Sequence, residues 1–296
     1  MVASKPKMTR PDVYQFRLGD YVVTNLLEGF AQRKDMHPFT AKNASPEEIQ
    51  AVATAHRLPF PALEHIFVPT LVDTGKQLIA FDPGFGENTP MATAGFFNSK
   101  LPAAGYSADD VDMVVVTHCH PDHIGNLATK DGKPTFPNAK IVFGRVDFDY
   151  WRRGENVSDM RKPTLDLFRR VCLPVAGQAI FVEAGQVVAP GITAVEAFGH
   201  SAGHMAYRIE SHGQSLMLMA DTVAHFAISI SHPEWHFFMD DDPEKAAVSR
   251  RRILSTVAEE KIAAIGFHMP FPSVGYIDRR GDGFAWVPAS YQMNLA

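Results

Sequence analysis

The sequence predicts one domain of mixed α and β structure (α+β), in which layers of β-sheet are covered by helices. Hydrophobic residues make up 46% of the 296 residues and charged residues 21%, so the chain can bury a sizeable core. Strand-like and helix-like segments follow one another along the chain. No low-complexity linker, charge block or short-period repeat divides it. Residues 1–296 are therefore expected to form a single domain with a short N-terminal extension.

The N-terminal third is predicted to be mostly β. Residues 13–24 contain two strand-like segments joined at Gly19-Asp20, and residues 66–82 contain a second pair that turns at residues 74–76. Between these pairs, Ser45 and Glu48 have the spacing of a helix start, with a serine N-cap and a glutamate three residues later. The Ala-rich helix that follows should end before Pro59.

The rest of the chain alternates helices and strands. A helix start at residues 107–110 precedes an apolar strand at 113–117 and a strand at 140–143, and residues 147–153 and 163–171 are predicted helices. Strands are expected at residues 179–183, 192–198, 205–211 and 214–220. Asp242 and Pro243 open a long helix that should end near residue 261. A strand at 262–267 and an edge strand at 281–287 complete the prediction.

Charge and cysteine content exclude several classes of protein. A net charge of -5 and a pI of about 6.2 argue against a protein built to bind nucleic acid. Cys119 and Cys172 are too few for a disulfide framework, so a reducing compartment fits. The N-terminus lacks the apolar run of an export signal, and an earlier signal would have been removed. No apolar stretch approaches the ~20 residues that span a bilayer. We expect a cytoplasmic protein without a membrane partner.

The strongest chemical signal is the segment Thr117-His118-Cys119-His120-Pro121-Asp122-His123, at the end of an apolar strand. In extended backbone, residues two apart point the same way, so His118 and His120 can bind one metal ion from the same side. The turn that follows directs Asp122 and His123 to a neighbouring position. Imidazole and carboxylate ligands suit zinc and similar divalent metals.

Further candidate ligands follow three downstream strands. Residues 198–204 contain both His200 and His204, Asp221 ends the apolar run 216–220, and His268 ends the strand at 262–267. Each lies where a buried strand leads into a loop, which is a common position for functional groups on a rigid scaffold. The sequence therefore predicts a metal centre assembled from several strand ends.

These residues together resemble the metallo-β-lactamase superfamily, whose pattern is H-x-H-x-D-H followed by a distant His, an Asp and a last His. The resemblance extends from about Tyr14 to the C-terminus and implies an αββα sandwich with a metal cleft between the edges of two mixed β-sheets. It implies two divalent ions, zinc first, although Mn, Co and Fe share these ligands. By the same resemblance, the first metal is bound by His118, His120 and His200. The second is bound by Asp122, His123 and His268, and Asp221 bridges the two.

The resemblance also assigns roles beside the ligands. It favours His200 over His204 as the ligand, which leaves His204 as a supporting residue. Asp82, before a Pro-Gly turn, resembles a family element that supports the metal loop by hydrogen bonds, although a plain turn aspartate is the alternative. Cys119 lies between two ligands, but its side chain should point away from theirs into the core. The six remaining histidines are expected to be surface or hydrogen-bonded residues: His37, His56, His65, His212, His232 and His236.

The C-terminal run from His268 through Pro-Phe-Pro to Gly283-Phe284-Ala285-Trp286-Val287-Pro288 resembles methyl parathion hydrolase and its dihydrocoumarin-lactonase and arylesterase relatives. That resemblance makes four residues candidate walls of a substrate pocket, with core packing as the alternative: Trp151, Phe168, His225 and Phe226. Many N-acyl homoserine lactonases have a tyrosine where this chain has Ala224, and His225 could supply the same hydrogen bond.

The predicted function is that of a dinuclear-metal hydrolase, in which a metal-bridging hydroxide cleaves a lactone or aryl ester and Asp122 and Asp221 are the catalytic carboxylates. Organophosphate triesters are expected as secondary substrates. The alternatives are an N-acyl homoserine lactonase, a dedicated organophosphate hydrolase, a β-lactamase and a non-enzymatic metal-dependent sensing module. The expected partners are a small ester-like substrate and a second copy of the chain in a homodimer.

Overall fold

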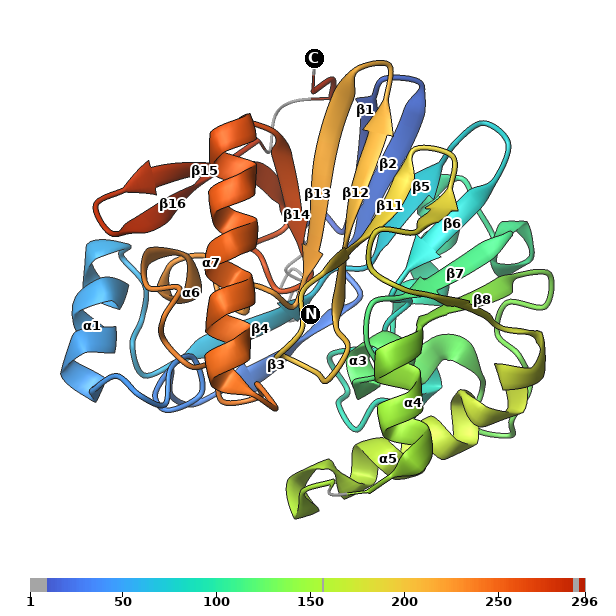
Figure 1. Ribbon diagram of the computed structural model, residues 1–296, viewed down its shortest axis with the longest axis horizontal. Helices are drawn as coiled ribbons and strands as arrows, with labels where there is room; N and C mark the ends of the chain where they lie inside the picture. The colour runs from blue at the N-terminus through green and yellow to red at the C-terminus, as the bar shows by residue number, and fades with distance from the viewer. Residues whose placement is uncertain (1–9, 156, 290–292, 296) are drawn as a thin grey trace, which may run out of the picture.

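The computed structural model describes residues 10–155, 157–289 and 293–295. Two mixed β-sheets form its centre (Figure 1). The first has the order β1-β2-β5-β6-β7-β8-β9, with the bounds β1 (Val13–Leu18), β2 (Tyr21–Leu26), β5 (Thr70–Asp73), β6 (Leu78–Phe81), β7 (Met113–Val116), β8 (Lys140–Gly144) and β9 (Ile180–Val182). Strands β6 to β9 are parallel, because each connection carries a helical crossover, and the hairpin strands are antiparallel.

The second sheet has the order β10-β11-β12-β13-β14-β15-β16. Its strands are β10 (Val187–Ala189), β11 (Ile192–Glu196), β12 (Met205–Ser211), β13 (Gln214–Ala220), β14 (Ala263–Gly266), β15 (Val274–Arg280) and β16 (Gly283–Pro288). Only the β13–β14 pair among these is parallel, because α7 (Pro243–Glu260) connects the two strands. The predicted edge strand near the C-terminus is confirmed as β16.

Helices cover the outer faces of both sheets. The strands alternate in period two, so Val115 and Leu218 face the space between the sheets, whereas Val114 and Met217 face outward. The outer face of the first sheet packs against α2 (Phe97–Ala104), α4 (Arg145–Arg153) and α5 (Lys162–Val171). The outer face of the second packs against α7, which crosses it in Figure 1. This arrangement confirms the predicted αββα sandwich.

A small two-stranded sheet lies beside the sandwich. It pairs β3 (Gly29–Arg33) with β4 (Leu63–Phe67), and the capped helix α1 (Pro46–Ala55) lies between them in sequence. The capping box at Ser45 and Glu48 is present as predicted. The predicted second hairpin is corrected: β5 and β6 form it, whereas residues 66 and 67 belong to β4. The backbone at residues 68 and 69 separates the two pairings.

Several elements were not predicted. They include β3, β10, β15, α2 and the short helices α3 (Pro121–Ile124) and α6 (Ile228–Ser231). Helix α2 contains Pro102, which is a signal against a helix in sequence. The helix start at Ser107 leads only to a single 3-10 turn at Ala108–Asp110. The predicted N-terminal extension lies largely outside the described residues. Among the residues that are described, no helix is long and apolar enough to cross a membrane.

Candidate metal centre

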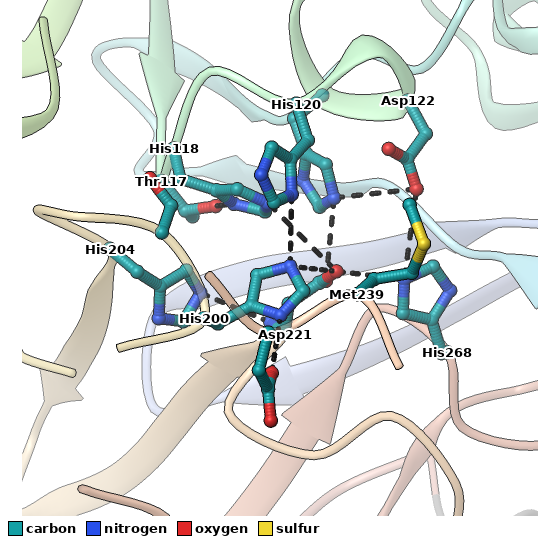
Figure 2. A network of polar contacts seen from close by, with 12 residues as sticks. Thr117, His118, His120, Asp122, His200, His204, Asp221, Met239 and His268 are labelled. Carbon is teal, nitrogen blue, oxygen red and sulfur yellow. Dashed lines mark hydrogen bonds and ion pairs between the residues drawn. The ribbon is translucent and has the colours of Figure 1, made fainter. Parts of the chain in front are cut away.

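The candidate ligands converge because the strands that carry them end at the same edge of the sandwich. Strand β7 leads through residues 117–120 into the short helix α3 (Pro121–Ile124), which Pro121 opens. Residues 197–204 connect β11 to β12, and Asp221 and His268 follow β13 and β14. Figure 2 shows side chains from these segments pointing toward a common centre.

Two clusters form there, and within each cluster the candidate ligand atoms lie within 4.8 Å of one another. Their members are His118, His120 and His200 in the first, and Asp122, His123, Asp221 and His268 in the second. Asp221 contacts both: its Oδ2 lies 3.2 Å from Nε2 of His200 and 2.9 Å from Nε2 of His268. The structure therefore brings together all seven predicted residues, with Asp221 between the two clusters.

The first cluster places three imidazole nitrogens almost in contact. Nε2 of His118 lies 2.9 Å from Nδ1 of His120, which lies 3.0 Å from Nε2 of His200. Burial lowers the pKa of His118 well below its ordinary value, and mainly burial lowers that of His120 to about 3, so both rings are neutral. Lone pairs brought this close repel unless a cation lies between them. The donor set therefore fits a divalent metal ion.

The nitrogen that each histidine turns away from the centre lies near a polar group. Nδ1 of His118 faces the hydroxyl of Thr117 at 3.1 Å, and Nδ1 of His268 donates to the carbonyl of Ile66 at 2.8 Å. The other three outward nitrogens face carboxylates: His120 faces Asp241, His123 faces Asp82 and His200 faces Asp240. The hydrogen bonds of His118, His200 and His268 are of the kind that fixes the ring orientation and tautomer of a metal-binding histidine.

Asp240 is itself held by a fully buried arginine. Arg250 of α7 donates to Asp240 at 2.9 Å and to the carbonyls of Thr222, Pro233 and Trp235. Burial alone would lower the pKa of His200, but the hydrogen bonds to Asp221 and Asp240 raise it to about 9. The acidic surroundings that favour a proton on His200 also favour a metal cation at the same ring.

His204 supports the site without joining a cluster. Its Nδ1 donates to the carbonyl of Ala197 at 3.0 Å, and its Nε2 accepts from the backbone N–H of Asp221 at 3.2 Å. Both ring nitrogens are therefore engaged. This geometry agrees with the preference for His200 over His204 and explains how the second histidine acts, since it positions the backbone of Asp221.

Two buried carboxylates hold the loops that carry the histidines. Asp82 accepts from the backbone N–H and hydroxyl of Thr117 at 2.8 and 2.7 Å, which confirms the predicted support of the metal loop. Asp147 of α4 accepts from the backbone N–H groups of Cys119 and Gly203 at 2.7 and 3.0 Å. It thereby ties the first histidine loop to the second. The thiol of Cys119 is buried in the core of the first sheet, as expected.

Two cavities adjoin the centre. A cleft of about 250 Å³ contains residues of both clusters, among them His120, Asp122 and Asp221. A larger cavity of about 690 Å³ is lined mainly by apolar side chains such as Met36, Leu63 and Phe271. His268 lines both, so the larger cavity opens beside the candidate metals.

The predicted pocket residues divide into two groups. His225 and Phe226 line the larger cavity. Trp151 and Phe168 are fully buried in the core against Phe148, so the expectation that they wall the pocket is wrong in this structure. Trp151 is on α4 and Phe168 is on α5, and both side chains pack between these helices and the outer face of the first sheet. Trp151 reaches the site only by an edge contact with the ring of His120, at 6.0 Å between centroids.

Sequence reasoning missed several residues of the site. His65 is buried and stacks on His268, with ring centroids 3.9 Å apart, whereas the sequence predicts only a surface or hydrogen-bonded residue. Arg33 and Arg161 line the metal cleft. Asp240 and Asp241 precede the N-cap of α7, and this run of acids was the signal that could have identified them. No motif marks His65 or Arg33.

A family model for the metallo-beta-lactamase superfamily matches residues 69–266, which include six of the seven cluster residues, and His268 follows two residues after the match. The chain belongs to the metallo-β-lactamase superfamily. This membership and the two clusters make it a metal-dependent hydrolase with sites for two divalent ions.

Curated relatives in this superfamily include N-acyl homoserine lactonases. That of Bacillus cereus is 26% identical over 207 residues, which cover 65% of this chain and 73% of the relative. The lactonase AiiA of Bacillus thuringiensis subsp. kurstaki is 27% identical over the same length and coverage.

Solved structures of the same fold cover almost the whole chain. AidC, a dizinc quorum-quenching lactonase in complex with a product, has a TM-score of 0.89 and 26% identity over 95% of this chain and 98% of its own. The hydrolase AbOPH has a TM-score of 0.88 and 24% identity over 96% and 100% of the two chains, which shows the shared fold.

Proposed function

We propose that this protein hydrolyses uncharged, largely apolar lactones or aryl esters. The observation that carries the proposal is the position of the large apolar cavity beside the second cluster, with His268 in the walls of both cavities. If the apolar acyl or aryl group of a substrate occupied this cavity, the ester bond of that substrate would lie near the metal positions. A cavity of this size and lining suits a small-molecule substrate.

The seven cluster residues are the proposed metal ligands. His118, His120 and His200 would hold one ion, Asp122, His123 and His268 the other, and Asp221 would bridge them. Two divalent ions at these positions, with zinc as the expected metal, would supply a hydroxide nucleophile at neutral pH and would polarise the substrate oxygen. Asp122 is partly accessible from the cleft, so its carboxylate can orient the nucleophile and accept its proton.

His225 offers a fixed hydrogen-bond donor to the substrate. Its Nδ1 accepts from the backbone N–H groups of Ala227 and Ile228 at 3.2 Å each. Burial lowers the pKa of His225 to about 3, so the neutral ring carries its proton on Nε2. Because His225 lines the larger cavity, this N–H can meet a substrate carbonyl where Ala224 offers no side-chain donor.

Among lactones, N-acyl homoserine lactones are favoured by the comparisons, since the curated relatives and AidC carry that activity or a lactonase activity in their names. Aryl esters and dihydrocoumarin are favoured by the C-terminal resemblance to methyl parathion hydrolase and its relatives. Organophosphate triesters would be secondary substrates, because a bridging hydroxide and two Lewis acids serve carbonyl and phosphoryl centres alike.

The test compares kcat/KM for dihydrocoumarin, N-hexanoyl homoserine lactone, a paraoxon-type triester and a carbapenem at one metal loading. We expect the two lactones to lead, because the cavity is apolar and uncharged substrates lose little hydration on entry. A carbapenem that leads by ~100-fold, equal to about 2.7 kcal/mol of transition-state binding, would instead assign a β-lactamase. No turnover of any ester with both metals bound would favour the sensing module.

We further propose that the protein acts in the cytoplasm as a homodimer. The two cysteines, too few for a disulfide framework, fit a reducing compartment and support the location.

A further inference from the structure

The pairing of β3 with β4 places an arginine in the wall of the metal cleft. Ala31 lies opposite His65, and Arg33 lies opposite Leu63 at the end of β3. Residues two apart on a strand share a face. Ala31, Arg33 and His65 accordingly all line the cleft that contains His120, Asp122 and His268.

The guanidinium of Arg33 is ordered but has free donors. It lies 3.5 Å from the ring centroid of Phe39, so one face of the planar group is covered. Its Nε is buried and has no hydrogen-bond partner, and no carboxylate pairs with the guanidinium among residues 10–155, 157–289 and 293–295. A buried donor without a partner costs free energy that a ligand oxygen would recover.

The second arginine in the cleft is different. Nε of Arg161 donates to Asp241 at 2.9 Å, and another of its nitrogens donates to the carbonyl of Met239. Arg161 therefore supports the loop beside His120, which Asp241 faces at 3.6 Å. The contrast indicates that Arg33 is the arginine available to a ligand.

We propose that Arg33 binds a carbonyl oxygen of the substrate outside the scissile bond, such as the amide oxygen of an N-acyl homoserine lactone. The inference rests on the proposed function and deepens it. Two divalent ions would already polarise the scissile carbonyl, so the donors of Arg33 serve a second acceptor. The ring of Phe39 restricts the motion of the guanidinium, whose planar set of N–H groups suits an amide or carboxylate oxygen.

The test compares Arg33→Met with Arg33→Lys on two substrates at equal metal content. N-hexanoyl homoserine lactone has an amide oxygen beyond its ring ester, whereas dihydrocoumarin has only the scissile carbonyl. Loss of one charge-assisted hydrogen bond should raise KM for the first about 10- to 100-fold, with kcat within about 3-fold. KM for dihydrocoumarin should change by less than about 2-fold. Arg33→Lys should recover part of the loss.

Arg145→Met is the matched control, because Arg145 on α4 lies over the ring of Phe181 at 4.8 Å but lines neither cavity. This variant should leave KM and kcat for both substrates unchanged. Equal changes of KM for the two substrates in Arg33→Met, or no change with both metals bound, would overturn the proposal.

A binding measurement separates this proposal from the proposed function. If the wild-type protein hydrolyses neither lactone, the proposed function fails, and calorimetric titration of the metal-loaded protein with N-hexanoyl homoserine still tests Arg33. This compound keeps the amide oxygen. A Kd at least about 10-fold weaker in Arg33→Met than in wild type and Arg145→Met would support the role, and equal Kd values would contradict it.

Discussion

His200 and His204 differ in how their ring nitrogens are used, although both lie in one glycine-rich loop. His200 turns Nε2 toward the other cluster residues, whereas both nitrogens of His204 bind backbone groups. We expect His200→Ala to lower kcat/KM by at least ~100-fold and to reduce the metal content. His204→Ala should be milder, since it disturbs only the position of Asp221.

Steady-state kinetics with elemental analysis of each variant would measure this difference. His212→Ala, in the turn between β12 and β13, serves as a histidine control that should leave both readouts unchanged. A larger loss in His204→Ala than in His200→Ala would show that the ligand assignment is reversed.

At the scale of elements, the segment after β6 depends on one buried carboxyl group. Oε1 of Glu28 accepts from the backbone N–H groups of Phe85 and Gly95 at 3.0 and 2.8 Å, and Phe85 lines the metal cleft. Burial raises the pKa of Glu28 to about 7, although these hydrogen bonds act in the opposite direction. The folded state therefore retains a proton that the unfolded chain loses near pH 4.5.

Because its folded pKa is raised, the contribution of Glu28 to stability is fully present below about pH 4.5 and is lost as the pH rises through about 7. This titration changes the free energy of unfolding by up to about 3 kcal/mol. Glu28→Gln keeps an acceptor for the two N–H groups but does not titrate. We expect denaturant unfolding to show the variant becoming more stable relative to wild type from pH 5 to pH 8. A constant difference across this range would contradict the raised pKa.

Elements with a local sequence signal were predicted, whereas elements that depend on distant packing or pairing were not. Helix α1 has its complete signal in a few residues, from Ser45 to Glu48, and formed as expected. Helix α2 contains Pro102, and its burial of Phe97 and Leu101 against the first sheet outweighs that local signal. Strand β3 is stable because β4 pairs with it, and its partner is about thirty residues away.

At the scale of the whole molecule, the metal centre connects the two sheets. His118, His120, Asp122 and His123 follow the first sheet, whereas His200, Asp221 and His268 follow the second. Ions bound between them should stabilise the folded state, by about 2.7 kcal/mol for each site at a free metal concentration 100 times its Kd. We therefore expect chelation to abolish activity and lower the Tm, and zinc to restore both.

Elemental analysis of the active protein should find two ions per chain. Asp221→Ala provides a matched test, because it removes the carboxylate that contacts both clusters and should reduce both the metal content and the change in Tm on chelation. Full activity with one ion or none would contradict a dinuclear centre.

The sequence by itself determined which residues could carry the chemistry. Strand-end positions and ligand-type side chains are local properties, so the histidine-rich turn, Asp221 and His268 could be identified without coordinates, and Asp82 with them. The order of strands and helices likewise predicted layers of sheet covered by helices, and the resemblance to the superfamily implied two sheets.

Only the tertiary structure decided how these residues are supported and what surrounds them. His65, Asp240 and Arg33 reach the site through pairings and packing between distant segments, which no local pattern encodes. Trp151 and Phe168 looked like pocket walls, but an aromatic side chain fits a pocket and a core equally well in sequence. Which of the two it enters depends on the face of the sheet that its helix covers, and that is fixed only when the whole chain folds.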